Sequence, residues 1–196
     1  SWGILIGLSV VFSAAGIYLS SVAGEHLGDE GHYLIQAQSL VCDGDLDLRN
    51  DLRKEFDEQD LKRIPRGRMH IADNSRGEHW YSWHPFGLSL LLAPLWPLGM
   101  TARQIALALM AAAGCAGMFL LSRRAGASRR AALVATLGLG LSVYWFVYAL
   151  RSLPEVLGAS LLVWVFWAIA AQKSQPWLSA VVAVGCVVYL PFAHAR

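Results

Sequence analysis

Charged side chains are scarce in this sequence: they make up 15% of its 196 residues, while 56% of the residues are hydrophobic. Soluble domains carry roughly 25% charged residues. All acidic residues except Glu155 lie between Glu25 and Glu78. A net charge of +2 is too small for the basic surface that nucleic-acid binding requires. The composition therefore argues against a soluble domain and a nucleic-acid partner, and predicts an integral membrane protein with one polar region near its start.

Cysteine is also rare, and its three positions form neither an even disulfide framework nor a CxxC pair. Cys115 and Cys186 lie inside apolar segments, where a thiol is typical of a small buried hydrophobic side chain. The cysteines therefore give no evidence for a disulfide-stapled module.

Five apolar segments are close to the roughly 20 residues that a helix needs to cross a bilayer. They are Trp2–Val22, Thr101–Leu121, Ala131–Leu150, Leu153–Ala171 and Trp177–Phe192. We therefore predict an all-α fold, a polytopic bundle of transmembrane helices. Residues 1–22 form the first span, 23–100 an extracytoplasmic loop, and 101–196 four further spans. The sequence starts inside an apolar run and stops just after another, so we expect it to be part of a longer chain.

The orientation of the bundle is predicted from the four arginines of the segment Arg123–Arg130, because loops rich in Arg and Lys stay in the cytoplasm. The segment His84–Gly99 decides on which side this loop lies. It is short for a span and rich in proline, which favours a surface helix that dips into the outer interface. If it crosses the membrane instead, the four arginines lie outside. We prefer the first alternative, which places the Arg151–Glu155 turn and His194–Arg196 on the extracytoplasmic side.

The segment Asp29–Cys42 has apolar residues at helical spacing along one stripe, which predicts a short amphipathic helix on the membrane surface. Asp29 and Glu30 open this helix directly after the first span. One interpretation is a helix cap, because acidic residues in a first turn stabilise the positive end of the helix dipole. The other is a carboxylate held at the membrane boundary as a general base for a lipid-borne substrate.

Residues that can ligate a metal also gather near the start of this helix. They are His26, Asp29, Glu30 and His32. Their spacing does not match that of a zinc helix such as HExxH. We therefore favour a site without a divalent metal near Asp29 and expect no cofactor.

Glu155 is the one acid among the apolar segments, where ionisable groups are costly and commonly functional. Its position at a predicted helix start also suits a cap, and Arg151 is its expected partner. His194 and Arg196 end the last apolar segment on the same side. The guanidinium of Arg196 can clamp a lipid phosphate, or only extend towards the headgroups. His84 marks a turn into the interface.

The order of these segments resembles the N-terminal half of the membrane glycosyltransferases of the C superfamily. These include bacterial relatives of protein O-mannosyltransferases and of the lipid A aminoarabinose transferase. The resemblance is carried by GDEGHYLIQAQSLVCDGDLDL, HWYSWHPFGLSLLLAPLWPLG, LSRRAGASRRAAL and RSLPE. The family typically has an acidic pair after the first span, a GD at the end of the surface helix, and a proline turn before an apolar stretch. Here these are Asp29-Glu30, Gly44-Asp45 and His84-Pro85-Phe86-Gly87.

The resemblance implies a sugar donor linked to a polyprenyl phosphate, and an inverting transfer at the extracytoplasmic face of a bacterial inner membrane. It implies Asp29 as the catalytic carboxylate, with Glu30 beside it. The candidate substrate-binding residues are then His84, Arg151, Glu155, His194 and Arg196. Family members usually have eight or more spans, which is more than this chain has. The alternative is a non-catalytic membrane subunit, a truncated relative that docks in a larger membrane complex.

Overall fold

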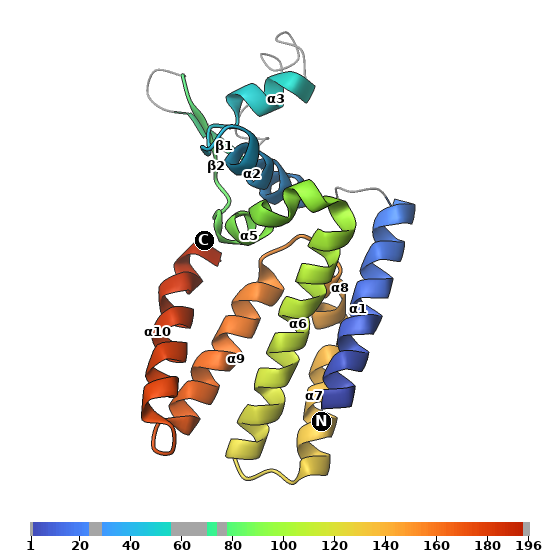
Figure 1. Cartoon of the computed structure of the whole chain (residues 1–196), viewed down its shortest axis with the longest axis vertical. Helices are drawn as coiled ribbons and strands as arrows, with labels where there is room; N and C mark the ends of the chain where they lie inside the picture. The colour runs from blue at the N-terminus through green and yellow to red at the C-terminus, as the bar shows by residue number, and fades with distance from the viewer. Residues whose placement is uncertain (1, 24–28, 56–69, 74–77, 194–196) are drawn as a thin grey trace.

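The computed structural model describes residues 2–23, 29–55, 70–73 and 78–193, which are mostly helical (Figure 1). The elements in chain order are α1 (Trp2–Ala23), α2 (Glu30–Cys42), α3 (Arg49–Glu55), β1 (Ile71–Asp73), β2 (Trp80–Ser82), α5 (Gly87–Leu92), the 3-10 helix η2 (Ala93–Leu98), α6 (Gly99–Arg124), α7 (Arg129–Gly140), α8 (Val143–Ala149), α9 (Glu155–Ala171) and α10 (Pro176–Ala193). The two strands pair antiparallel, with Ala72 opposite Tyr81. This small sheet departs from the all-α fold that the sequence predicts.

Two helical stretches are long and apolar enough to cross a membrane. They are Gly87–Arg124, which contains α6, and Pro176–Ala193, which is α10. Helices α7 and α8 give a third if this bent pair is one span. Two further apolar helices, over Ile6–Leu19 and Glu155–Ala171, are shorter. Residues 2–23, 29–55, 70–73 and 78–193 thus contain two or three candidate spans, which fits a membrane protein but is fewer than the five predicted.

The predicted span over Ala131–Leu150 is broken, because α7 and α8 meet at an angle of 61°. Between them Ser142 has an extended backbone, and its Oγ accepts a hydrogen bond from the Trp145 backbone N–H. A serine in this position stabilises a new helix start by about 1 kcal/mol. The apolar residues continue through the break, so their pattern alone did not predict it.

Helix α6 is the centre of the bundle, because it packs against α1, α7 and α9, while α10 packs against α9 (Figure 1). Two glycines allow the closest approaches. A side chain at Gly114 would collide with Ser160 and Trp145, and one at Gly87 would collide with the backbone of Phe192. Helix association in lipid depends on such close packing rather than on hydrophobic burial. These glycines therefore fix α6 against α8 and α9, and α5 against α10.

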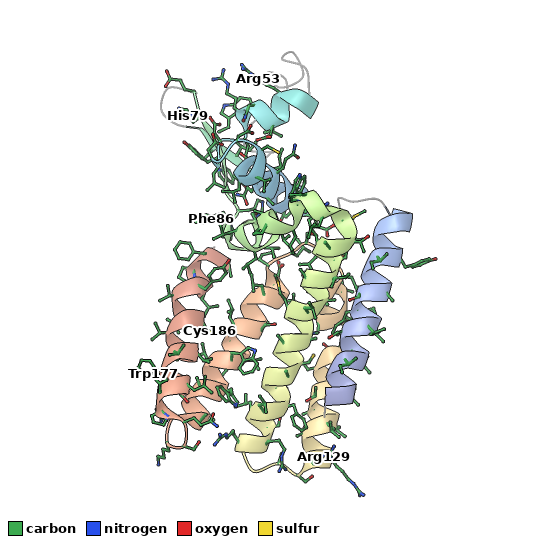
Figure 2. All side chains as sticks on the ribbon, in the orientation of Figure 1. Arg53, His79, Phe86, Arg129, Trp177 and Cys186 are labelled. Carbon is green, nitrogen blue, oxygen red and sulfur yellow. The ribbon has the colours of Figure 1, made fainter. Side chains whose placement is uncertain are left out.

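The two ends of the bundle carry different groups. Figure 2 shows Arg129 at one end, and Arg53 and His79 at the other. The α6–α7 and α9–α10 connections lie together at the first end, where Arg124 donates a hydrogen bond to Ser174. Helices α2, α3 and α5 and the two strands lie at the second end (Figure 1). All candidate site residues that the structure describes belong to this second end, to the turn before α9 or to the first residue of α9.

Helices α5 and η2, which belong to the segment His84–Gly99, are each six residues long. A six-residue α-helix is only about 9 Å long, at 1.5 Å per residue. Both elements lie against α2, and an apolar cluster joins them to the bundle. That cluster includes Tyr33, Leu34, Leu88, Leu92, Leu157 and Ala193.

Candidate functional site

Glu30, the first residue of α2, is buried, with 2% of its surface exposed. Its Oε1 accepts a hydrogen bond from the Ser152 backbone N–H at 2.7 Å, and its Oε2 lies 3.2 Å from Arg151 Nη1. A buried carboxylate needs such partners, because an unpaired buried charge costs several kcal/mol. Glu30 therefore fixes the start of α2 to the turn before α9.

Arg151 pairs with Glu30, so the pairing with Glu155 that the sequence suggested is wrong. The two residues are 121 positions apart, and no local spacing connects them. Glu155 opens α9, and its Oε2 is buried without a hydrogen-bond partner among the residues that the structure describes. Glu155 also borders a cavity of about 580 Å³. The other lining residues are Gly158, Ala159, Leu162, Leu190 and Pro191 of α9 and α10.

Asp29 lies immediately before α2, and its side chain is 33% exposed. It occupies the N-cap position, but its carboxylate accepts no capping hydrogen bond from α2 within the described part of the chain. Instead, its Oδ1 lies 3.5 Å from His70 Nδ1 and 3.8 Å from His84 Nε2. The two neighbouring acids thus have opposite surroundings: Glu30 is buried against a guanidinium, and Asp29 is partly open and faces two imidazoles.

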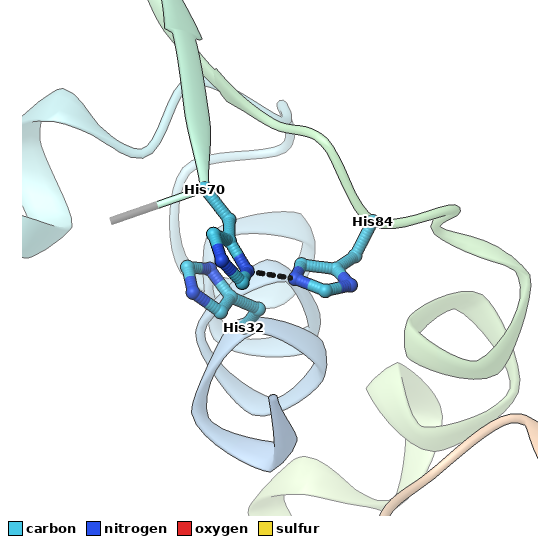
Figure 3. Close-up of side chains that lie close together, drawn as sticks. All are labelled: His32, His70 and His84. Atoms are coloured by element: carbon cyan, nitrogen blue, oxygen red, sulfur yellow. Dashed lines mark hydrogen bonds between the residues drawn. The ribbon is translucent and has the colours of Figure 1, made fainter. Parts of the chain in front are cut away.

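Three histidines from separate parts of the chain lie close together (Figure 3). Two of them, His70 and His84, face Asp29. His32 is on the first turn of α2, His70 precedes β1 and His84 follows β2. One ring nitrogen from each lies within 4.8 Å of those from the other two, and His70 Nδ1 is 3.1 Å from His84 Nε2. The His32 ring centroid is 5.7 Å from that of His70 and 4.7 Å from that of His84. We call these three residues the histidine cluster.

Hydrogen bonds to the backbone hold the cluster in place. His70 has a φ of 50°, a left-handed conformation that is uncommon for residues other than glycine. Its carbonyl accepts a hydrogen bond from the Trp83 N–H at 2.8 Å. The His84 carbonyl accepts one from Gln36 Nε2 at 3.0 Å, and Gln36 Oε1 in turn accepts one from Ser89 Oγ at 2.8 Å. The paired strands, α2 and α5 are therefore tied together at the cluster.

The surroundings of His32 favour its neutral form. Burial, followed by the nearby His84 and His70, lowers the pKa of His32 from 6.5 to about 4, against the opposing effect of Asp29. His32 is therefore neutral at pH 7 and has a lone pair on one ring nitrogen. The Tyr33 hydroxyl lies 3.4 Å from His84 Nδ1, so the other ring nitrogen of His84 faces Asp29 and His70.

Asp47 holds α3 against the second strand. Its Oδ1 accepts hydrogen bonds from the backbone N–H groups of Trp80 at 2.8 Å and Arg49 at 3.2 Å, and its Oδ2 lies 2.6 Å from His79 Nδ1. Burial alone would raise the pKa of Asp47, but the hydrogen bonds from Trp80, His79 and Arg49 hold it below its ordinary value. This carboxylate therefore stabilises the pair of strands that carries His70 and His84.

The structure brings together four of the site residues that the sequence suggested. They are Asp29, Glu30, His84 and Arg151, with Glu155 at the start of α9. Three others lie outside the described residues: His26, His194 and Arg196. Sequence reasoning missed His70, because only the pairing of β1 with β2 brings it to His84. A histidine in a strongly charged loop gives no local signal of this kind.

No protein family, curated protein or solved structure matches this chain. The function is therefore inferred from the chemistry of the site and from the sequence motifs.

Proposed function

We propose that this chain is a module of a membrane glycosyltransferase that takes its sugar from a polyprenyl-phosphate donor. The observation that carries the proposal is the contrast between two neighbouring acids. Glu30 is buried and held by Arg151, whereas the Asp29 carboxylate is one-third exposed beside the bundle end. A carboxylate in such a position can reach a substrate that is carried by a lipid. Glu30 then has an anchoring role, and Asp29 has the chemical one.

A five-span bundle follows from this proposal. Its spans are α1, α6, α7 with α8, α9 and α10, and α2 and α5 then lie at the membrane surface. The arginine-rich α6–α7 connection is in the cytoplasm by the positive-inside rule. The opposite end, with Asp29, is then extracytoplasmic, in a bacterial inner membrane. Helix α2, helix α5 and the two strands lie at the same end of the bundle, which supports this arrangement (Figure 1).

The cavity between α9 and α10 supports a lipid-linked donor. Its lining is apolar apart from Glu155, and it is open enough to take part of a polyprenyl chain. Tyr189 Oη donates a hydrogen bond to the Gly87 carbonyl at 2.7 Å, which ties α10 to α5 beside the surface helix. In this proposal Arg196, just after α10, binds the lipid phosphate as a guanidinium clamp.

The proposed reaction is a single inverting displacement. An acceptor hydroxyl attacks the anomeric carbon of the sugar, and Asp29 takes the hydroxyl proton. The bond between the sugar and the phosphate oxygen breaks, and polyprenyl phosphate leaves with the electron pair. A positioned general base contributes roughly a hundredfold to ten-thousandfold to the rate.

The test is sugar transfer from a panel of polyprenyl-phosphate sugars by the purified full-length protein. We expect Asp29→Asn to lower transfer at least about a hundredfold, the low end for a general base. The matched control is Asp43→Asn, which changes an exposed acid at the other end of α2 and should leave transfer unchanged. Near-normal transfer by Asp29→Asn would remove the catalytic role. A membrane subunit without its own chemistry would then explain the chain better.

A further inference from the structure

We infer that the histidine cluster binds one divalent transition metal of the zinc class, through a ring nitrogen of His32, His70 Nδ1 and His84 Nε2. The fourth coordination position faces Asp29. The sequence alone favoured a site without a metal, because it did not reveal that His70 and His84 meet His32. This inference stands on the geometry of the three imidazoles and does not require the proposed transferase activity.

The distances suit a tetrahedral site. Zinc–nitrogen bonds of 2.0–2.1 Å place neighbouring ligand atoms about 3.3–3.4 Å apart. His70 Nδ1 and His84 Nε2 are 3.1 Å apart, close to this separation. Asp29 Oδ1 lies 3.5 and 3.8 Å from these two atoms, so its carboxylate borders the fourth position. One ring nitrogen of His32 lies within 4.8 Å of a ring nitrogen of each of the other two histidines. A metal between the three rings therefore requires only small side-chain movements.

The donor atoms select the class of metal. Imidazole nitrogens suit zinc, copper, iron and nickel, whereas magnesium and calcium prefer oxygen ligands. Three protein ligands with an open fourth position are typical of catalytic zinc sites, and four are typical of structural ones. The partly exposed Asp29 carboxylate beside the open position fits the first type.

Surrounding groups orient the rings as they do around bound metals, where a ligating histidine usually donates its second N–H to a neighbour. Tyr33 Oη is 3.4 Å from His84 Nδ1, so this nitrogen can donate while Nε2 binds the metal. His70 is held in its left-handed conformation by Trp83, on whose ring it also stacks, with 6.1 Å between centroids. The hydrogen bond between His70 and His84 does not explain why the His32 ring stacks on His70 and also packs, tilted by 32°, against His84.

The experiment uses the purified full chain in detergent, stripped by a chelator and then titrated with Zn²⁺ in a calorimeter. We expect one equivalent to bind. Four-coordinate Co²⁺ in the same site should give intense visible absorption. Replacing His32, His70 or His84 by alanine should in each case weaken Zn²⁺ binding more than about 100-fold. The loss of a group that only orients a ligand typically weakens metal binding by roughly 10- to 100-fold. Tyr33→Phe should weaken it by about tenfold.

The matched control is His79→Ala, because His79 is a half-exposed histidine of the same loop that contacts Asp47 instead. This variant should bind Zn²⁺ as the unchanged protein does. Circular dichroism of each metal-free variant checks folding. If His84→Ala unfolds, His70→Ala decides the result, because the His70 side chain is 45% exposed and its removal disturbs less packing.

The inference is overturned if the unchanged protein binds no stoichiometric Zn²⁺, or if the three cluster variants bind it as His79→Ala does. These outcomes are separate from those of the transferase test. A protein that loses transfer through Asp29→Asn but never binds Zn²⁺ keeps the transferase and loses the metal. If the protein binds Zn²⁺ tightly but Asp29→Asn leaves transfer unchanged, the metal site stands and the catalytic role of Asp29 is lost.

Discussion

The ion pair between Glu30 and Arg151 allows the sharpest test of how α2 is held on the bundle. Arg151→Met keeps most of the side-chain volume but removes the positive charge beside Glu30. The buried Glu30 carboxylate then keeps only one of its two contacts with the turn before α9, the hydrogen bond from the Ser152 N–H. Removing one partner of a buried pair costs about 3–5 kcal/mol. The side chain of Arg151 is 13% exposed and that of Glu30 only 3%. Arg151→Met leaves the more buried of the two charges without its guanidinium partner, so its cost should lie near the upper end of this range.

The converse substitution, Glu30→Gln, should cost less. The glutamine oxygen still accepts the hydrogen bond from Ser152, and the Arg151 guanidinium is the more exposed of the two charges. In the double variant both charges are gone. Replacing both members of a buried pair by groups of similar volume is often close to neutral. We therefore expect the double variant to be more stable than Arg151→Met alone, with a coupling free energy of about 2 kcal/mol or more.

Cys115 provides the assay, because its thiol is fully buried in the bundle core. In a background of Cys42→Ser and Cys186→Ser, a thiol-reactive dye labels the chain only when the core opens. The temperature at which Cys115 becomes labelled in detergent then ranks the stability of the unchanged protein, the two single variants and the double variant. Additive effects of the two single substitutions, or costs below about 1 kcal/mol as for exposed ion pairs, would show that this pair does not anchor α2.

Two further predictions concern the polar end of the chain. Asp47→Asn should weaken the hydrogen bonds to Trp80 and Arg49 and raise amide hydrogen exchange at Trp80, at a local cost of about 1–2 kcal/mol for a partly exposed charged acceptor. Because the pKa of Asp47 is lowered in the folded chain, its stabilising effect is present above the ordinary value of 3.8 and disappears as the pH falls through the lower folded value. If the Trp80 amide already lost its protection from exchange near pH 6, this pH dependence would be wrong. For the orientation, an impermeant thiol reagent should label the exposed native Cys42 on whole cells. In a Cys42→Ser background, Ala125→Cys should label only after permeabilisation, and the reverse pattern would invert the bundle.

Much of the helical fold could be predicted from apolar patterning. The helical spacing over Asp29–Cys42 predicted α2 to within one residue, and two of the predicted apolar segments, Thr101–Leu121 and Trp177–Phe192, lie within α6 and α10. The break at Ser142 could not be predicted, because a capping hydrogen bond interrupts a helix without changing its hydrophobicity. The strands β1 and β2 were missed for another reason: each is three residues long, too short to show an alternating pattern.

The candidate site was only partly predictable, because its contacts join distant residues. Asp29 and Glu30 were identified from their place after the first apolar segment, but nothing in the sequence showed which of them is buried. That distinction comes from Arg151, which is 121 positions from Glu30. The role of His70 depends on the pairing of Ile71 with Ser82, which places it beside His84.

Three separate contacts position the site, and none of them uses the Asp29 carboxylate. The Glu30–Arg151 pair holds the start of α2, Asp47 holds the second strand, and Gln36 joins the His84 carbonyl to Ser89 of α5. Neighbouring residues on a helix point about 100° apart, which is why Glu30 can face the turn before α9 while Asp29 faces the histidine cluster. Loss of any one contact should therefore weaken metal binding and sugar transfer together. Asp29→Asn should lower transfer while leaving the three imidazole ligands in place. A parallel loss in all four variants would mean that Asp29 is one more positioning residue, and that the chemistry lies elsewhere.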